Sequence, residues 1–434
     1  TVQLKEVFEP LLKTVNAYKL AKEIENPLIY VLSEMEHEGV RIDQNALGEF
    51  SALLDTDIKA LEKSIYEKAG VKFNIASPKQ LGEVLFDKLH LDPKAKKTKT
   101  GQYQTGEEVL LGLATKSDIV KDILDFRQLQ KLKSTYVDAL PLMINKKTGR
   151  VHTSYNQAVA ATGRLSSNNP NLQNIPIRTE RGREVRKAFI PRDQDHVLLS
   201  ADYSQIELRL IAEISQDKNM LDAFQNGLDI HTATAAKVYG VSLSEVTSTQ
   251  RRNAKAVNFG IIYGQSAFGL SQSLGIPRKE AAEMIDNYFA EYPKIKQYMT
   301  DTIRFAQENG YVETIMGRRR YLRDINSANA TVRGFAERNA INAPIQGFIG
   351  DFKVMAMLSV FEHTSRDVVQ VLGEVHDSVL MWVKDSELNA TLPYIKELME
   401  HPPLIAELEI KLPVHLRVDI EVGRWGAGKV WQGT

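Results

Sequence analysis

Two aspartates in the chain occupy positions that suit ligands of a metal ion. Asp202 follows an apolar run at 197–199 with the composition of a buried strand, and Asp377 follows His376 at the tip expected between two apolar strands within 368–383. Two carboxylates at strand ends can bridge a pair of Mg²⁺ ions about 3.5–4 Å apart, the arrangement for in-line phosphoryl transfer. Oxygen ligands without a His or Cys cluster favour Mg²⁺ over Zn²⁺. The alternative for each aspartate is an ordinary turn residue.

A second pattern combines two cations with two aromatic rings. Arg251, Lys255, Phe259 and Tyr263 recur at every fourth position, and each step of four turns a helix by only about 40° beyond a full circle. The four side chains should therefore project from one broad helical stripe, which ends at Gly264 as a C-cap. Cations can grip a triphosphate while a flat ring stacks on a base. An ordinary amphipathic helix with an Arg/Lys rim is the alternative.

The elements around Asp202 should hold it rigidly. Ser204 is a suitable helix N-cap, and Glu207 three residues later completes a capping box before a helix that begins near Ile206. A strand, a short turn and a helix in succession would leave the Asp202 carboxylate at a rigid edge that solvent can reach.

Two amphipathic helices are expected to form an antiparallel projection. The first runs from Asp43 to Gly70, and the second carries an apolar face from Ile119 to Leu132. The polar stretch 92–108 between them reads as an exposed loop. Basic side chains clustered there could follow a phosphate backbone, although a solvated face is the alternative; the cluster consists of Lys94, Lys96, Lys97 and Lys99.

Further stretches carry polar side chains or define the remaining elements. Residues 161–176 form a long loop dense in Gly, Ser, Asn and Pro, which is either functional or a turn-rich connection. It offers donors to phosphate, sugar or base edges from Arg164, Asn171, Gln173 and Asn174. Residues 336–347 are expected to form a helix that places Arg338, Asn342 and Gln346 at every fourth position. A helical pattern covers 229–300, and 310–322 should form a hairpin that turns at Met316-Gly317.

Composition places the chain among ordinary globular proteins of several domains. It has 434 residues, of which 43% are hydrophobic and 25% charged, and this length predicts two to four domains. The chain has no cysteine, which excludes a disulfide framework and thiolate metal sites. A run of about 18 apolar residues is missing, as is a charged-then-apolar leader after Thr1, so neither a membrane span nor a secretory signal is expected. Basic and acidic residues each number 55, so any nucleic-acid binding must depend on local basic clusters.

Three stretches resemble the motifs of family A DNA polymerases. DYSQIELR (202–209) resembles motif A, RRNAKAVNFGIIYG (251–264) motif B, and VHD (375–377) the core of motif C. The stretches 26–43, 131–155, 162–176 and 336–347 also match, so the resemblance covers nearly the whole chain. Three long motifs in the right order make it specific.

The resemblance implies an α+β right-hand fold with an antiparallel-sheet palm, helical fingers and a helical thumb. The expected parts are a remnant of an exonuclease-like domain at 1–22, the thumb at 23–137, the palm at 138–212 and 331–434, and the fingers at 213–330.

The resemblance also implies the roles of individual residues. Asp202 and Asp377, with the Tyr203 carbonyl, would hold two Mg²⁺ ions, for which Mn²⁺ could substitute. The incoming dNTP would meet Arg251, Lys255, Phe259, Tyr263, His231, Glu207 and Gln205, and among these Glu207 would exclude a ribose 2′-OH. DNA would be contacted by Arg164, Asn171, Gln173, Asn174, Arg338, Asn342, Gln346, His376, which lies near the primer terminus, and the four lysines at 94–99.

The implied activity is DNA-templated DNA synthesis in replication and repair. A primer 3′-OH on primer–template DNA would be extended with dNTPs by two-metal-ion nucleotidyl transfer. Residues 1–22 are too few for an editing nuclease, so proofreading is not expected. A monomer without membrane attachment is expected, located in the cytoplasm at the nucleoid if the source is bacterial.

Two departures from the family pattern leave alternatives open. Ser378 stands where the family usually has Glu, and GFIGD (347–351) stands where it commonly has GTAAD. The first departure makes a catalytically weak relative that chiefly binds primer–template conceivable, and the second puts local palm packing in doubt. A single-subunit RNA polymerase of related fold is the other alternative, although Glu207 and the form of motif A favour DNA synthesis.

Overall fold

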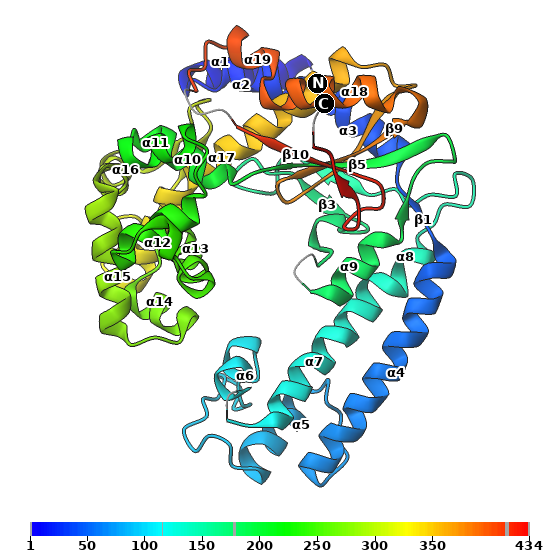
Figure 1. The fold of residues 1–434 in the computed structure, drawn as a ribbon, viewed down its shortest axis with the longest axis vertical. Coiled ribbons are helices and arrows are strands. Elements are labelled where there is room, and N and C mark those ends of the chain that lie inside the picture. Colours follow the sequence, from blue (N-terminus) through cyan, green and yellow to red (C-terminus); the bar gives the residue numbers. More distant parts are fainter. Residues whose placement is uncertain (1, 115, 177–178, 413–415, 433–434) are drawn as a thin grey trace.

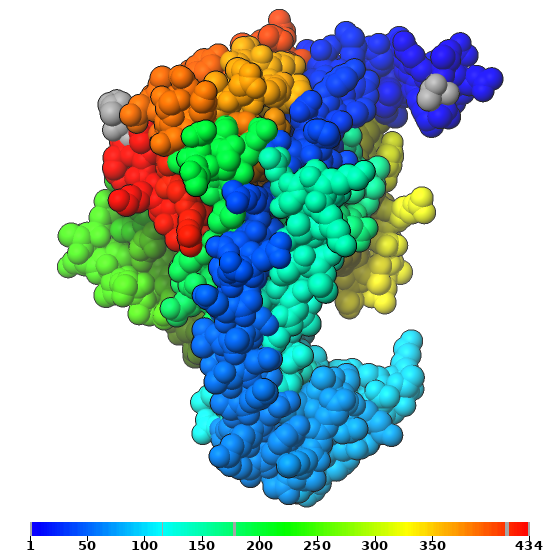
Figure 2. Space-filling model, turned by 90° about the vertical axis from the view of Figure 1, so that its right-hand side faces the viewer, coloured from blue at the N-terminus to red at the C-terminus, as the bar shows by residue number. Residues whose placement is uncertain are grey.

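The structure is a computed structural model that describes residues 2–114, 116–176, 179–412 and 416–432. Its three parts are arranged like an inverted U: a five-stranded sheet with covering helices at the top, a long helical arm extending down at the right and a helical lobe at the left (Figure 1). The space-filling view shows the arm extending below the sheet (Figure 2). Helices and antiparallel strands occur together, which confirms the expected α+β class.

The sheet has the strand order β11-β10-β5-β9-β8, and every neighbouring pair is antiparallel. The strands are β5 (His196–Tyr203), β8 (Val369–Val375), β9 (Ser378–Lys384), β10 (Val418–Val422) and β11 (Lys429–Val430). In β9, Val379, Met381 and Val383 belong to one apolar core, while Leu380 and Trp382 belong to a second core that continues into the arm. Both faces of the sheet are covered here, which explains why the strands read as continuous apolar runs.

The two apolar strands predicted within 368–383 and their tip at His376-Asp377 are confirmed as β8, β9 and the turn between them. Asp202 is the penultimate residue of β5, which confirms its predicted place at a strand end. It is a member of β5, where it pairs with Ser378 on one side and Asp419 on the other. The strand extends further than its apolar run because pairing with two neighbours satisfies the backbone of polar residues as well.

The predicted capping box at Ser204 is wrong. The Ser204 N–H donates to the carbonyl of Arg417, the residue before β10, at 2.9 Å. At Ser204 the chain therefore still forms hydrogen bonds of the sheet and has not yet entered the helix. The residue directly before α10 (Ile206–Ser215) is Gln205, with a left-handed φ of 54°. The Glu207 side chain points instead to Tyr263.

The predicted helix at 336–347 is part of α17 (Ala330–His363), a helix of 34 residues that contains Pro344. Gly347 allows this helix to approach the hairpin of β6 (Tyr311–Glu313) and β7 (Arg319–Tyr321), because a Cβ at this glycine would lie 2.6 Å from Thr314 Cγ2. Gly347 is common to this chain and the family pattern, whereas the departing Phe348 and Ile349 are buried in the apolar core, so the departure fits the packing around it. Gly317, with φ of 78°, lies in the predicted hairpin turn. Other helices near the sheet are α1 (Val2–Thr14), α2 (Tyr18–Leu20), α3 (Asn26–Glu38), α9 (Glu180–Lys187), α18 (Leu388–Glu400) and α19 (Pro403–Glu407).

The arm confirms the prediction of two long helices with an exposed loop between them. Asp43 caps α4 (Gln44–Ala69) by accepting from the N–H groups of Asn45 and Ala46, and Gly70 ends it with φ of 63°. The helix packs against α7 (Asp118–Leu132) along a shared apolar core. Shorter helices complete the arm: α5 (Pro78–Gly82), α6 (Glu107–Ala114) and α8 (Ala139–Leu142), with π-helical turns at Glu83–Lys88 and Lys133–Val137.

The helical pattern predicted for 229–300 is confirmed by the lobe. Its helices after α10 are α11 (Lys218–Gln225), α12 (Ile230–Tyr239), α13 (Ser248–Ile262), α14 (Ala267–Leu274), α15 (Arg278–Glu291) and α16 (Pro293–Asn309). Thr247 and Gln250 form a capping box at the start of α13, and Gly264 follows its end with φ of 66°. Figure 1 shows α13 on the side of the lobe that faces the arm.

The stretch 161–176 contains short elements rather than being a plain loop. Its residues include β3 (Ser166–Asn168), which pairs with β2 (Ser154–Asn156), and a 3₁₀ turn at Leu172–Asn174. A further small pair joins β1 (Arg41–Ile42) to β4 (Phe189–Ile190). Among the described residues, no helix combines the length and the apolar character needed to cross a membrane.

Candidate active site

The fold brings Asp202 and Asp377 together at one place on the sheet. The Tyr203 N–H donates to the Asp377 carbonyl at 3.2 Å. Ser378, the residue after Asp377, pairs with Asp202 and donates its hydroxyl to Asp202 Oδ1 at 2.7 Å. The turn that carries Asp377 has only two residues between β8 and β9, and His376 adopts a left-handed φ of 55° there.

The carboxylates at this place crowd one another electrostatically. The pKa of Asp202 is raised above its ordinary value by burial of the charged form and by repulsion from Asp377 and Asp419, against the hydrogen bond from Ser378. The side chain still reaches solvent. Surplus negative charge that remains accessible is what a divalent cation neutralises.

The donor set fits Mg²⁺ better than a softer metal. Within the described ranges, no group of three or more His, Cys, Asp or Glu is placed to hold a metal ion by itself. Mg²⁺ commonly binds through one or two carboxylates together with substrate phosphates and waters, so a pair of aspartates is sufficient. Tyr203 can contribute only its main chain, since its hydroxyl donates to the Met399 carbonyl at 2.8 Å inside the core.

Glu207 joins the sheet to the lobe and to α17. Its Oε1 accepts from the Tyr263 hydroxyl at 2.7 Å and from Gln346 Nε2 at 3.0 Å, and Arg164 Nη2 lies 4.0 Å away. Burial raises the pKa of the Glu207 carboxyl, while these partners oppose the rise and Asp377 adds to it. Four of the predicted site residues therefore meet in one cluster, which a pattern of local spacing could not show.

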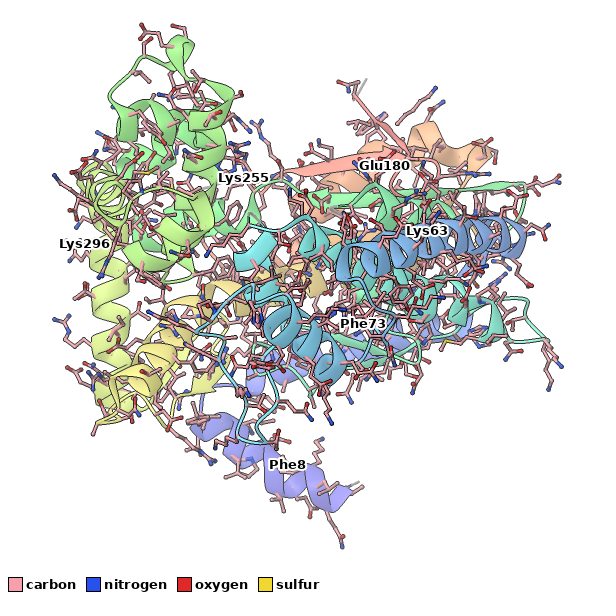
Figure 3. The ribbon with its side chains drawn as sticks, turned by 90° about the horizontal axis from the view of Figure 1, so that it is seen from below. Phe8, Lys63, Phe73, Glu180, Lys255 and Lys296 are labelled. Carbon is pink, nitrogen blue, oxygen red and sulfur yellow. The ribbon has the colours of Figure 1, made fainter. Side chains whose placement is uncertain are left out.

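The cation–aromatic stripe lies on α13 as predicted. Arg251 and Lys255 are exposed, and Lys255 is seen on the lobe in Figure 3. Phe259 is partly buried with its ring 5.8 Å from that of His231, and Tyr263 caps the helix with 41% of its surface exposed. The stripe thus joins an exposed cationic end to an aromatic end beside Glu207.

Asp229 binds Arg251 at the cationic end of the stripe, and it was not predicted as a site residue from the sequence. Arg251 donates to both of its carboxylate oxygens, from Nε at 2.7 Å and from Nη2 at 3.1 Å. Asp229 also caps α12 by accepting from Thr232. Although burial opposes it, these bonds leave the pKa of Asp229 well below its usual range. The capping position before a helix was the available signal.

His231, two residues after Asp229, is buried. Its Nδ1 lies 3.1 Å from Asn258 Nδ2. Burial lowers its pKa to about 4. The charges of Arg251 and Lys255 lower this pKa as well, whereas the charge of Asp229 acts to raise it. The imidazole is therefore neutral at pH 7 and can donate only one hydrogen bond.

Most of the predicted DNA-contacting residues fall into three groups. Asn171 accepts from the Gln173 N–H, and Gln173 bonds Ser167 and Leu165, so these two amides also brace their own segment. Asn174, Arg338 and the four lysines at 94–99 are exposed. In the described part of the chain, Arg164 Nε and Asn342 Oδ1 are buried without a hydrogen-bond partner, and such atoms are expected to meet a ligand or water.

His376 and Gln205 are both held by the backbone at positive φ next to the aspartates. Burial lowers the pKa of His376, and the nearby Arg186 guanidinium contributes. Gln205 precedes α10 and is partly buried. Asp419, opposite Asp202 on β10, was not singled out from the sequence, although it lies in an alternating strand pattern.

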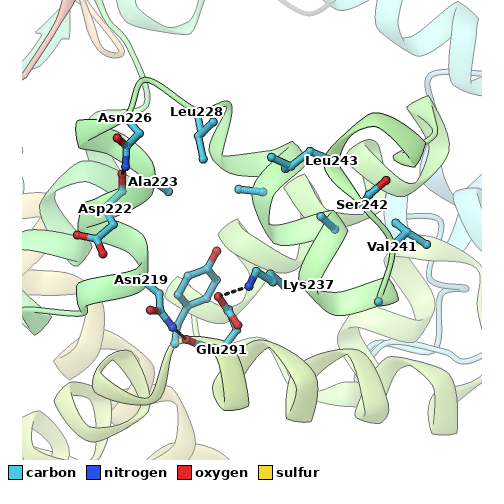
Figure 4. A pocket seen from close by; sticks show the side chains of 14 residues that line it. Asn219, Asp222, Ala223, Asn226, Leu228, Lys237, Val241, Ser242, Leu243 and Glu291 are labelled. Carbon is cyan, nitrogen blue, oxygen red and sulfur yellow. Dashed lines mark hydrogen bonds and ion pairs between the residues drawn. The ribbon is translucent and has the colours of Figure 1, made fainter.

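Two cavities of the lobe differ in their relation to this site. One of 560 Å³ lies between α11, α12 and α15, with the Lys237–Glu291 ion pair (3.5 Å) at its wall (Figure 4). It is lined by none of the predicted site residues. The other, of 620 Å³, is lined by Phe259, Tyr263 and Arg338 at the end of α13. The second cavity therefore belongs to the candidate site.

Comparison with known proteins defines the class. The family described as DNA polymerase family A matches residues 44–427, which is most of the chain. The chain therefore belongs to DNA polymerase family A.

Individual relatives are bacterial enzymes named DNA polymerase I. The chain is 49% identical to that of Geobacillus stearothermophilus over 93% of its own length and 45% of the relative, and 46% identical to that of Bacillus subtilis over 97% and 47%. It thus spans about half the length of these curated relatives. A solved structure, the polymerase domain of Pol1 from M. smegmatis in complex with DNA primer–template and dNTP, is similar with a TM-score of 0.90 and 38% identity, covering 98% of this chain and 74% of that one.

The first prediction concerns the Ser378 position. Ser378→Glu should lower the Mg²⁺ concentration for half-maximal single-nucleotide incorporation several-fold with a similar rate at saturation, because an added carboxylate beside Asp202 is worth about 1 kcal/mol when screened. Ser378→Ala, which removes the hydroxyl without adding charge, is the control. Coincident Mg²⁺ titrations of the parent and the Glu variant would show that this position is electrostatically silent.

The second prediction concerns pH and His231. A histidine whose pKa is lower when folded takes up protons more readily in the unfolded chain, so acidification below pH 6.5 favours unfolding. The free energy of unfolding should fall by about 2 kcal/mol between pH 7 and pH 5 on account of this group. His231→Gln should reduce the pH 7-to-5 drop in the thermal midpoint, with the exposed His37→Gln as control. An unchanged drop in His231→Gln would contradict the assignment.

Proposed function

We propose that this chain is a DNA-templated DNA polymerase that extends a primer 3′-OH with dNTPs through nucleotidyl transfer at Asp202 and Asp377. The observation that carries the proposal is that these two aspartates lie side by side at one end of the β5–β9 pair, where Asp202 pairs with Ser378 and the Tyr203 N–H donates to the Asp377 carbonyl; family membership supports it. The relative solved with DNA primer–template and dNTP supports the choice of substrates.

Asp202 and Asp377, with the main-chain carbonyl of Tyr203, are the residues that would hold two Mg²⁺ ions, or Mn²⁺ in their place. When bound, the ions supply Lewis-acid activation of the primer 3′-OH and neutralise charge on the leaving pyrophosphate. The protein fixes both carboxylates before substrate arrives. Ser378 orients Asp202 by a hydrogen bond, and the two-residue turn orients Asp377.

The incoming nucleotide would lie along α13. Arg251 and Lys255 are exposed cations suited to the triphosphate, and the neutral His231 can donate to a phosphate oxygen. Phe259 and Tyr263 would stack on or beside the new base pair, above the cavity they line.

Glu207 would select the sugar. Its carboxylate is held by Tyr263 and Gln346 and is therefore fixed against the place where a ribose 2′-OH would project. Gln205 lies between Asp202 and Glu207, directly before α10, and from this position it would also contact the incoming dNTP.

The duplex would pass between the sheet and the arm. Arg164, Arg338, Asn342 and Gln346 would meet minor-groove acceptors that all base pairs share, and the unpaired Asn342 and Arg164 atoms support this. Asn171, Gln173 and Asn174 would shape and face the same passage, and His376 would lie near the primer end. The lysines at 94–99 on the arm would contact the backbone, which makes binding salt-dependent.

This assignment divides the chain into the parts of a hand. The arm (23–137) would be the thumb, the sheet with its helices (138–212 and 331–434) the palm, and the lobe (213–330) the fingers, with 1–22 as an exonuclease-like remnant. Every proposed site residue comes from one chain, so a monomer suffices. In a bacterial cell the DNA substrate would place the protein at the nucleoid.

The third prediction tests the carboxylates. Asp202→Asn or Asp377→Asn should reduce primer extension by more than about 100-fold, because loss of an outer partner alone typically costs 10–100-fold, while duplex affinity stays within about twofold. Asp385→Asn, just past the far end of β9, is the matched control. Assays with dNTPs, with NTPs and without Mg²⁺ separate DNA synthesis from RNA synthesis and from binding alone. Comparable turnover by either mutant would remove the assignment.

The fourth prediction is that the polypeptide of 434 residues does not proofread. The carboxylate pair that we assign serves synthesis, and the sequence pattern leaves no second paired-acid stretch for a nuclease. A mismatched primer incubated with Mg²⁺ and no dNTPs should keep its length. The prediction would be overturned by stepwise loss of 3′ nucleotides from the primer, provided that the loss persists in Asp202→Asn and after further purification.

A further inference from the structure

The buried side chain of Lys353 on α17 touches the turn that carries Asp377. Its Nζ donates to Glu374 Oε1 at 2.9 Å and to the main-chain carbonyl of His376 at 2.5 Å. The Lys353 and Glu374 side chains are only 1% and 4% exposed. An ammonium and a carboxylate are thus withdrawn from water within one residue of the candidate catalytic aspartate.

This arrangement is more than a device for stability. Withdrawing two charges from water costs much of what their attraction returns, and buried pairs can often be replaced by apolar residues without loss of stability. The Lys353 ammonium also has a second acceptor besides Glu374, which is the backbone of the turn itself. The geometry therefore directs the ammonium to the turn, and Glu374 balances its charge.

The turn has a reason to need such support. Strand residues Val375 and Ser378 pair directly, which leaves His376 and Asp377 as the whole connection. His376, the first residue of this turn, adopts a φ of 55°, and glycine is the usual residue with such a φ in tight hairpin turns. A histidine there is strained, and its carbonyl accepts from the buried Lys353 ammonium, which satisfies this backbone group from within the protein.

The neighbouring residue of α17 supports the other aspartate. The Phe352 ring packs edge-on against Tyr203, the residue after Asp202, with ring centroids 5.6 Å apart. Consecutive residues of one helix therefore contact the chain next to both aspartates. The spacing between the two carboxylates is set by α17 as well as by strand pairing.

We propose that Lys353 is a positioning residue that fixes the His376-Asp377 turn through its hydrogen bond to the His376 carbonyl, with Glu374 as its counter-ion. The inference rests on the proposed function for its catalytic meaning. Its structural core, the rigidity of the turn, is independent of any activity.

The test compares Lys353→Met/Glu374→Leu with the parent protein. The double variant replaces the buried pair by apolar side chains, so its thermal midpoint should stay close to that of the parent. Amide hydrogen exchange of peptides covering 372–380 should become at least about tenfold faster, while peptides of β10 keep their protection. Single-turnover dNTP incorporation should fall at least about tenfold, with primer–template affinity unchanged within about twofold.

Glu374→Gln is the matched control because it keeps Lys353 and an acceptor for it. This variant should retain the slow exchange of 372–380, whereas Lys353→Met should lose it, both measured below their thermal midpoints. Parent-like exchange and incorporation in the double variant would overturn the proposal, and so would equal exchange in Glu374→Gln and Lys353→Met. If the parent protein itself failed to extend primers while the double variant showed fast exchange, the role of Lys353 in fixing the turn would be upheld. Only the proposed function would then be rejected.

Discussion

The structure depends on holding two like charges side by side, one on the strand β5 and the other in the turn that leads into the neighbouring strand β9. Asp202 and Asp377 repel each other, and Asp419 adds to the repulsion from the third strand. A flexible chain would separate such groups. Here the antiparallel pairing of β5 with β9, the tight turn before β9 and apolar cores on both faces of the sheet oppose that separation. Rigidity of this kind lets carboxylates remain poised for a cation instead of relaxing away from one another.

The long helix α17 links this centre to the rest of the molecule. Along its length, Gln346 reaches Glu207, Asp351 pairs with Arg318 of the β6–β7 hairpin, and Lys353 reaches the turn of β8 and β9. Arg318 continues the connection to Glu25 near α3. One helix therefore carries contacts to the hairpin, to the first helices and to the residues next to both aspartates. Among the residues that depart from the usual family pattern, Phe348 and Ile349 lie in the apolar core, and Gly350 lies where this helix meets the Arg164 segment.

The cluster of Glu207, Tyr263 and Gln346 performs a different task, because it joins the lobe to the sheet and to α17. Its members come from the start of α10, the end of α13 and the middle of α17. Hydrogen bonds of a buried carboxylate are strong when fully formed. The lobe is thereby fixed relative to the sheet at the point where its aromatic stripe ends, while the cationic end of the stripe remains exposed beside Asp229.

The sequence alone determined those features that depend on local periodicity. The arm helix from Asp43 to Gly70, the stripe on α13 and the apolar strands of 368–383 follow from repeats of 3.6 and two residues and from end signals such as caps and glycines. Motif resemblance then indicated which polar residues belong together. Only the tertiary structure decided that Asp202 lies inside its strand opposite Ser378, that Glu207 serves Tyr263 instead of capping its own helix, and that Lys353 reaches the turn. These contacts join residues far apart in the chain, and their partners are chosen by strand register and helix packing, which leave no periodic trace in a single sequence.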